Sequence, residues 1–142
     1  MVAYSFAPQF IAPIEAGTKC QTVRGHRPRH ARVGEPIQIY TGMRTKQCRK
    51  LVDPDPIVSR VWPITVYINK LYHTGEIISL IQLDGHDLPA AEMEAFARSD
   101  GFMADEDASA LRRMGEFWVK AHKITGDFFI FDGVCIRWAW PQ

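Results

Sequence analysis

The sequence has little of what marks membrane, secreted or disulfide-rich proteins. No window approaches the roughly 20 apolar residues of a membrane-spanning helix, so no membrane partner is predicted. The first residues lack a basic region followed by an apolar run, so no signal peptide is expected. Three cysteines, an odd count at wide spacing, indicate free thiols in a reducing compartment. A cytoplasmic protein is therefore predicted.

The short motifs of many nucleotide- and metal-binding proteins are also missing. There is no P-loop, no dinucleotide-binding glycine pattern and no Gly-x-Ser-x-Gly. His26 and His30 are four residues apart, but Pro28 between them disfavours the helix on which such a pair would bind zinc. Cys20 and Cys48 have no Cys-x-x-Cys partner. Neither a metal nor a cofactor is predicted.

Acidic residues are scarce in one long segment. Between Lys19 and Lys50 the only acid is Glu35. The bases of this segment are nine: Lys19, Arg24, Arg27, Arg29, Arg32, Arg44, Lys46, Arg49 and Lys50. The rest of the chain holds eight bases and fifteen acids, so the formal net charge of +1 conceals a divided molecule. A basic region of this kind indicates an anionic partner, most commonly nucleic acid.

The length of 142 residues fits a single domain over residues 1–142. With 46% hydrophobic residues, such a domain can bury a core. Alternating or β-branched segments predict strands at Cys20–Arg24, Ile37–Tyr40, Gln47–Val52, Pro63–Tyr72 and Glu76–Leu83. Asp132-Gly133 predicts a hairpin turn between two further strands, Phe128–Phe131 and Val134–Trp140.

Apolar spacing and end signals predict helices in three segments: Ser5–Ala16, Leu88–Asp100 and from about Asp105 to Lys123. Gly17 and Gly101 are expected to end the first two helices, and Asp87 to cap the second. Strands and helices do not alternate along the chain. We therefore expect an α+β fold, a small and mostly antiparallel β-barrel with a two-helix insertion covering one end.

Lys19 and Thr22 are candidate catalytic residues at the start of the first predicted strand. Three residues apart, they would face opposite sides of an extended chain, so they share a pocket only if a turn or bulge intervenes. A partly buried lysine has a lowered pKa and can act as a base toward a hydroxyl, which is a poor nucleophile unaided. The alternative is a surface lysine and an ordinary strand threonine.

Asp100 is the third candidate catalytic residue. It lies at the predicted C-terminal end of a helix, where a negative charge is unfavourable by a few tenths to ~1 kcal/mol. Gly101 behind it allows a sharp bend that would aim the carboxylate into a cleft. The alternative is a solvated residue at the helix end.

Several residues of the basic segment are candidates for nucleic-acid binding. Arginine grips phosphate with two parallel N–H donors, and the candidates are Arg24, Arg27, Arg29, Arg32 and Arg44. Tyr40 and Trp62 are candidate stacking partners for a base, with a place in the core as their alternative.

Two stretches resemble a known family. Gly17-Thr-Lys-Cys-Gln-Thr-Val-Arg24, followed by the turn and strand 33–42, resembles the ASCH domain of the PUA-like superfamily. The recurring pattern of that family is Gly-x-Lys-x-x-Thr-x-Arg, then a Gly-Asp or Gly-Glu turn and a strand. Asp100-Gly-Phe102 resembles the acidic-Gly-Phe element of the family, and Tyr40–Leu51 is similar to short members from phages and prophages.

This resemblance implies a PUA-like β-barrel with a cleft for a nucleobase, a nucleoside or RNA, with DNA left open. For a phage-encoded member the location would be the host cytoplasm. Some members remove the acetyl group of N4-acetylcytidine, using the lysine and threonine of the shared stretch and a glutamate of the helical insertion. By position these roles fall on Lys19, Thr22 and Asp100. Other members bind RNA or act as ribonucleases, and both remain alternatives here.

Overall fold

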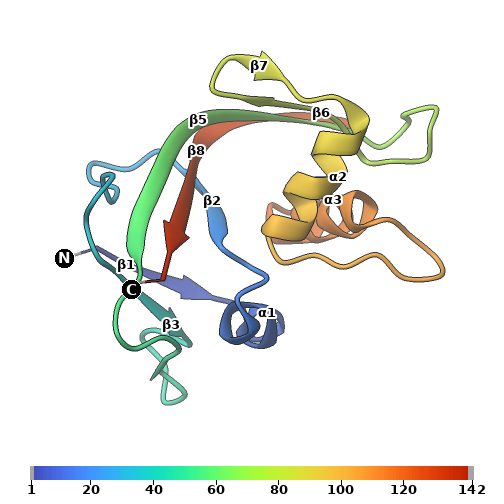
Figure 1. The fold of residues 1–142 in the computed structure, drawn as a ribbon. Coiled ribbons are helices and arrows are strands. Elements are labelled where there is room, and N and C mark those ends of the chain that lie inside the picture. The colour runs from blue at the N-terminus through green and yellow to red at the C-terminus, as the bar shows by residue number, and fades with distance from the viewer. Residues whose placement is uncertain (1, 141–142) are drawn as a thin grey trace.

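The computed structural model describes residues 2–140 as an α+β fold with mostly antiparallel strands, as predicted (Figure 1). The elements are β1 (Val2–Phe6), a 3-10 turn η1 (Pro8–Phe10), α1 (Ile11–Ala16), β2 (Gln21–Gly25), β3 (Ile37–Thr41), β4 (Arg49–Lys50), β5 (Ile57–Asn69), β6 (Ile78–Leu83), β7 (His86–Asp87), α2 (Ala90–Ser99), α3 (Ala110–Ala121) and β8 (Phe128–Ala139). Among these helices, none is long and apolar enough to cross a membrane.

The strands form two sheets. The larger has the order β2-β8-β5-β6-β7, and the smaller has the order β1-β3-β4 with β1 parallel to β3. They join at one corner, where Pro36 forms a bridge with Ile57 and the Gly34 N–H donates to the Val58 carbonyl at 2.8 Å. Within residues 2–140 these pairings do not close into a ring, so the predicted barrel stays a prediction. In Figure 1, β5 and β8 arch side by side from the smaller sheet toward α2 and α3.

The predicted hairpin at Asp132-Gly133 is wrong. β8 passes through these residues as one strand that pairs with β2 and β5. Gly133 lies opposite Gly25, and a Cβ there would lie 2.3 Å from the Arg24 carbonyl oxygen. This glycine therefore allows a close approach of two strands, which a side chain would prevent, and makes no turn.

Other predicted boundaries also shift. The segment predicted as one helix from Ser5 begins with the end of β1, because Tyr4 and Phe6 are buried on alternate positions as in a strand. β5 begins six residues before Pro63, and its length was missed because proline disfavours a strand interior. The predicted strand Gln47–Val52 shrinks to the two residues of β4.

The helix caps differ from the predicted ones. α2 begins after Pro89, and no side chain caps it, so the cap predicted at Asp87 is wrong. α3 begins at Ala110, and the Ser109 hydroxyl caps it by accepting the Arg112 backbone N–H. The first turn predicted from Asp105 is instead a loop, in which the Asp105 carboxylate accepts two backbone N–H groups. The two predicted helix ends at Gly17 and Gly101 are confirmed, with φ values of +80° and +102°.

Candidate active site

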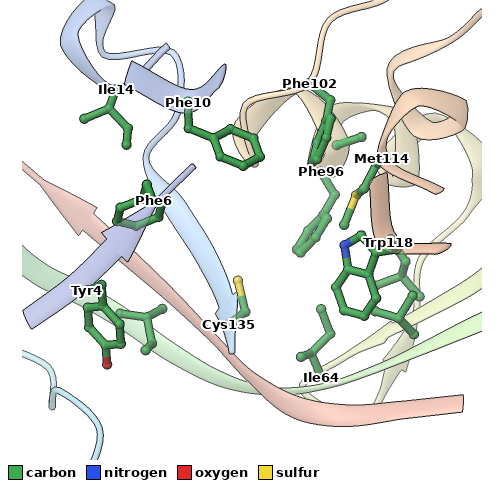
Figure 2. Packing of buried hydrophobic residues seen from close by; sticks show 14 of the residues in the cluster. Tyr4, Phe6, Phe10, Ile14, Ile64, Phe96, Phe102, Met114, Trp118 and Cys135 are labelled. Atoms are coloured by element: carbon green, nitrogen blue, oxygen red, sulfur yellow. The ribbon is translucent and has the colours of Figure 1, made fainter. Parts of the chain in front are cut away.

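A pocket of about 220 Å³ lies between the β1–α1 segment, β2, the end of α2 and the end of α3. It is lined by Ser5, Phe6, Ala7, Phe10, Lys19, Thr22, Val23, Arg24, Asp100, Phe117, Trp118 and His122. Figure 2 shows Phe6 and Phe10 on one side, Trp118 on the helical side and Cys135 of β8 between them. All three residues predicted as catalytic therefore line one pocket, together with one of the predicted arginines.

Lys19 reaches this pocket because the chain turns before β2 begins. Gly17 ends α1 in the left-handed region, and the backbone N–H groups of Thr18 and Lys19 both donate to the Pro13 carbonyl at 3.0 Å. The next N–H group, that of Cys20, donates to the Ser99 carbonyl at 3.1 Å. Lys19 thus stands outside the extended strand, so it can share a pocket with Thr22 as the prediction required.

The ammonium group of Lys19 lies in a largely apolar setting. Lys19 is only 2% exposed, and Nζ lies 4.5 Å from the ring centre of Phe10 and 5.4 Å from that of Phe6. Nζ donates to the backbone carbonyl of Asp100 at 2.5 Å. Burial lowers the pKa of Lys19 from its ordinary value of 10.5, and the Asp100 carboxylate offsets this in part. The neutral amine, which is the form that acts as a base, becomes easier to populate.

Asp100 lies just after the last turn of α2 and is 5% exposed. Its Oδ1 lies 3.7 Å from Lys19 Nζ and has no hydrogen-bond partner among residues 2–140. Burial raises the pKa of this carboxyl above its ordinary 3.8, and the positive charge of Lys19 offsets part of that rise. A buried oxygen without a partner costs free energy, so a bound ligand that donates an N–H there would be stabilised.

Gly101 brings these two residues together. At its φ of +102°, a Cβ would lie 2.8 Å from Lys19 Cδ and 3.1 Å from the Phe10 ring. A side chain here would therefore displace the lysine as well as strain the backbone.

Arg24 binds the hydroxyl that is the candidate nucleophile. Its Nε donates to Thr22 Oγ1 at 2.9 Å, and its Nη2 donates to the Ser5 carbonyl at 2.8 Å. The second bond links β2 to β1, which are edge strands of different sheets. Because the guanidinium already donates to Oγ1, the hydroxyl proton of Thr22 is left to point elsewhere, and the positive charge favours an alkoxide on that oxygen.

The other residues predicted to bind nucleic acid do not line the pocket. Arg27 lies over the Tyr4 ring at 4.7 Å, and Arg29 forms an ion pair with Glu35 at 2.6 Å. The Arg32 backbone N–H donates to the same glutamate at 2.7 Å. The three remaining residues also lie away from the pocket: Arg44 exposed in a loop, Tyr40 half-buried in β3 and Trp62 against the Arg137 guanidinium. Among the residues predicted to bind nucleic acid, Arg24 is therefore the one that lines this pocket in the described part of the chain.

Sequence reasoning missed one wall of the pocket. Phe117, Trp118 and His122 lie within the helix predicted from about Asp105 to Lys123, and none of them was named as a site candidate. All three line the pocket at the end of that helix. No sequence signal separates a helix face that packs in the core from one that borders a cavity, because both are apolar.

A search of residues 2–140 for groups of His, Cys, Asp and Glu that could hold a metal ion finds none. The chain was also compared with protein-family models, with curated proteins and with solved structures, and none of the three comparisons gives a match.

Proposed function

We propose that this protein is an amidohydrolase that removes an acyl group from the amino group of a nucleobase, with N4-acetylcytidine as the candidate substrate. One observation carries the proposal: a buried lysine, a threonine hydroxyl and a buried carboxyl line the same small pocket. These are the parts that nucleophilic amide cleavage needs, namely a base, a nucleophile and an acid. The resemblance of Gly17–Arg24 to the ASCH stretch supports the same assignment.

In the first step the neutral amine of Lys19 takes the proton of Thr22 Oγ1, which attacks the acyl carbon. The carbonyl π electrons move onto the oxygen, and Arg24 stabilises that negative charge, because two of the five N–H donors of its guanidinium are used on Thr22 and Ser5. The tetrahedral intermediate then expels the nucleobase amine. The carboxylic acid of Asp100 protonates the leaving nitrogen, and the proton on Lys19 restores Asp100.

The burial of the acid–base pair suits this sequence of steps. Desolvation favours the neutral forms of both Lys19 and Asp100, an amine and a carboxylic acid, over the ion pair. A neutral amine can accept the threonine proton, and a protonated acid can donate to a leaving group. The unpartnered Asp100 Oδ1 would receive the N–H of the bound amide.

The pocket favours a small substrate. Its volume of about 220 Å³ lies below the roughly 300–1,000 Å³ of pockets for drug-sized ligands. Aromatic walls from Phe10, Phe117 and Trp118 suit a single flat ring. We also propose that the two sheets are a PUA-like barrel left open between β1 and β2, because the pocket lies where those two edges are linked by Arg24.

The test is incubation with N4-acetylcytidine, followed by chromatography of the cytidine released. We expect turnover by the wild type and its loss in Lys19→Met and Thr22→Val, which keep the approximate size of each side chain. Lys46→Met, at an exposed position away from the pocket, is the matched control and keeps full activity. Wild-type turnover no faster than that of Lys19→Met would overturn the proposal.

The second candidate function is a module that binds RNA or other nucleic acid without catalysis. The basic residues of the loop 25–32 favour this function. Among the described residues, Glu35 is the acid that contacts this loop, through Arg29 and the Arg32 backbone N–H, so most of the positive charge there is not neutralised. Binding would then weaken steeply with salt, in proportion to the phosphates contacted. A ribonuclease would need both this surface and the pocket.

A further inference from the structure

In the proposed reaction, hydrolysis of the acyl ester on Thr22 requires a group that takes a proton from water and passes it on. Lys19 and Asp100 are 2% and 5% exposed, so neither has open access to solvent. The pocket lining holds two other ionisable side chains, those of Arg24 and His122. Arginine stays protonated in proteins and cannot relay a proton. His122 is exposed, and an imidazole can both accept and donate a proton, which is what a relay requires.

The local structure fixes the ring form of His122. Its Nδ1 lies 3.0 Å from the Trp118 carbonyl oxygen, which can only accept a hydrogen bond. Nδ1 must therefore carry a proton, and in the neutral imidazole Nε2 is then the free acceptor. The ring also stacks on Trp118, with centroids 4.6 Å apart and planes 27° apart, and packs edge-on against Phe131 at 5.5 Å. A ring held in this way keeps Nε2 in one place.

We propose that His122 is the acid–base residue of the second half of the reaction, in which water hydrolyses the acyl ester on Thr22. This inference rests on the proposed amidohydrolase function. His122 Nε2 takes one proton from the attacking water while the oxygen forms its bond to the acyl carbon. The Thr22 Oγ1–acyl bond then breaks, and the proton on Nε2 passes to Oγ1. The products are the free carboxylic acid and the restored threonine hydroxyl, so atoms and charge balance.

The small size of the pocket supports this division of labour. Thr22, Trp118 and His122 all line the same pocket of about 220 Å³, so the inference requires an acyl group on Thr22 to face the wall formed by Trp118 and His122. Departure of the nucleobase leaves room for a water molecule on that side. Lys19 and Asp100 lie beside the end of α2, where they serve the first half of the reaction.

The decisive experiment compares His122→Phe with the wild type in rapid-mixing assays on N4-acetylcytidine. Phenylalanine keeps the stacking on Trp118 and removes Nε2. We expect a burst of cytidine of about one equivalent per enzyme, followed by turnover slowed roughly 10²- to 10⁴-fold, the range for a lost acid–base group. His73→Phe is the matched control, because His73 also packs against a neighbouring ring, that of Tyr72, with centroids 4.6 Å apart, but lies outside the pocket.

A second variant separates chemistry from structure. His122→Ala leaves space for a free imidazole, which should restore turnover at millimolar concentration, whereas His122→Phe should not respond. Nitrogen NMR of the wild type gives a readout besides activity, since it should show His122 with its proton on Nδ1. A merely structural role for His122 at the helix end predicts a lower melting temperature with neither burst nor rescue.

The outcomes are distinguishable. If the wild type releases no cytidine, the proposed function fails and the role of His122 fails with it. If the wild type is active and His122→Phe turns over within twofold of it without a burst, only the role of His122 is overturned. A proton found on Nε2 in the NMR spectrum would also overturn it.

Discussion

Lys19 Nζ lies 2.5 Å from the backbone carbonyl oxygen of Asp100 but 3.7 Å from the nearer carboxylate oxygen of the same residue. The lysine is thus anchored by the main chain at the end of α2, while Oδ1 of the carboxyl group stays without a hydrogen-bond partner among residues 2–140. The bond from Lys19 Nζ to this main-chain carbonyl can persist when either side chain changes its protonation state, so the lysine is held in place independently of the Asp100 carboxyl group.

Asp100→Asn should lower the turnover of N4-acetylcytidine by roughly 10²- to 10⁴-fold, the range for a lost general acid. The amide has the size of the carboxyl group but cannot give a proton to the leaving amine. Steady-state kinetics measures the effect, and a thermal melt shows whether the fold persists. We expect the melting temperature to stay or rise, because a neutral group replaces a buried acid. Unchanged kinetics would remove Asp100 from the mechanism.

The free energy of unfolding should depend on pH through the same residues. The pKa of Asp100 is raised above 3.8 in the folded protein. Between 3.8 and the folded pKa, the folded state therefore binds more protons than the unfolded state, so the free energy of unfolding falls as pH rises through this range. The pKa of Lys19 is lowered below 10.5, so stability falls as pH decreases from 10.5 through the folded pKa. Urea unfolding across pH measures both slopes. Asp100→Asn should remove the acidic one and Lys19→Met the basic one.

Gly101→Ala should destabilise the protein by about 1–3 kcal/mol, the range for a residue forced into a sparsely populated conformation. The added Cβ would also push against Lys19 Cδ, so activity should fall further than stability alone explains. Gly85→Ala is the matched control, with a φ of +79° and no atom within 4 Å of the added carbon. Equal effects of the two variants on turnover would show that the approach to Lys19 is unimportant.

Arg24→Lys should reduce both activity and stability. A lysine has no Nε–H fork, so it cannot bind Thr22 Oγ1 and the Ser5 carbonyl together. We expect a loss of about 2 kcal/mol in unfolding free energy, from a hydrogen bond to a charged group. Denaturant unfolding and kinetics measure the two effects, with Arg27→Lys, at an exposed position, as control. A variant as stable as the wild type would show that the link between β1 and β2 contributes nothing.

Nucleic-acid binding, if present, should depend unequally on two neighbouring arginines. Arg29 is paired with Glu35 at 2.6 Å, whereas Arg27 donates only to a backbone carbonyl at 2.8 Å. Arg27→Gln should therefore weaken binding to single-stranded RNA more than Arg29→Gln, and reduce the salt slope by about 0.7 for each phosphate that is no longer neutralised. Fluorescence anisotropy across salt concentrations measures this. The opposite ranking would mean that the ion pair opens on binding.

The sequence predicted the ends of the first two helices better than the strands. Gly17 and Gly101 were readable as helix ends, and these two ends are what bring Lys19 and Asp100 to one pocket. The strand errors share a physical cause. Pro63 and Gly133 were interpreted by local preference as a boundary and a turn, whereas strand pairing over long distances keeps both inside strands. The proposed role of His122 rests on its contact with Phe131 of β8, which no local sequence pattern reports.

The position of β8 also determines when the pocket can exist. β8 is the last strand of residues 2–140, yet it lies between β2 and β5 in the sheet. The backbone N–H of Trp138 donates to the Cys20 carbonyl at 2.9 Å, next to Lys19 in the chain. β5 also pairs with β6, whereas β2 pairs only with β8 among residues 2–140, so β2 joins the sheet only when this late segment is in place. Assembly of the sheet thus depends on pairing between distant parts of the chain, which makes folding slow relative to hairpin-built sheets of similar size. The protein should acquire ligand binding in its final folding phase, together with the burial of Trp138.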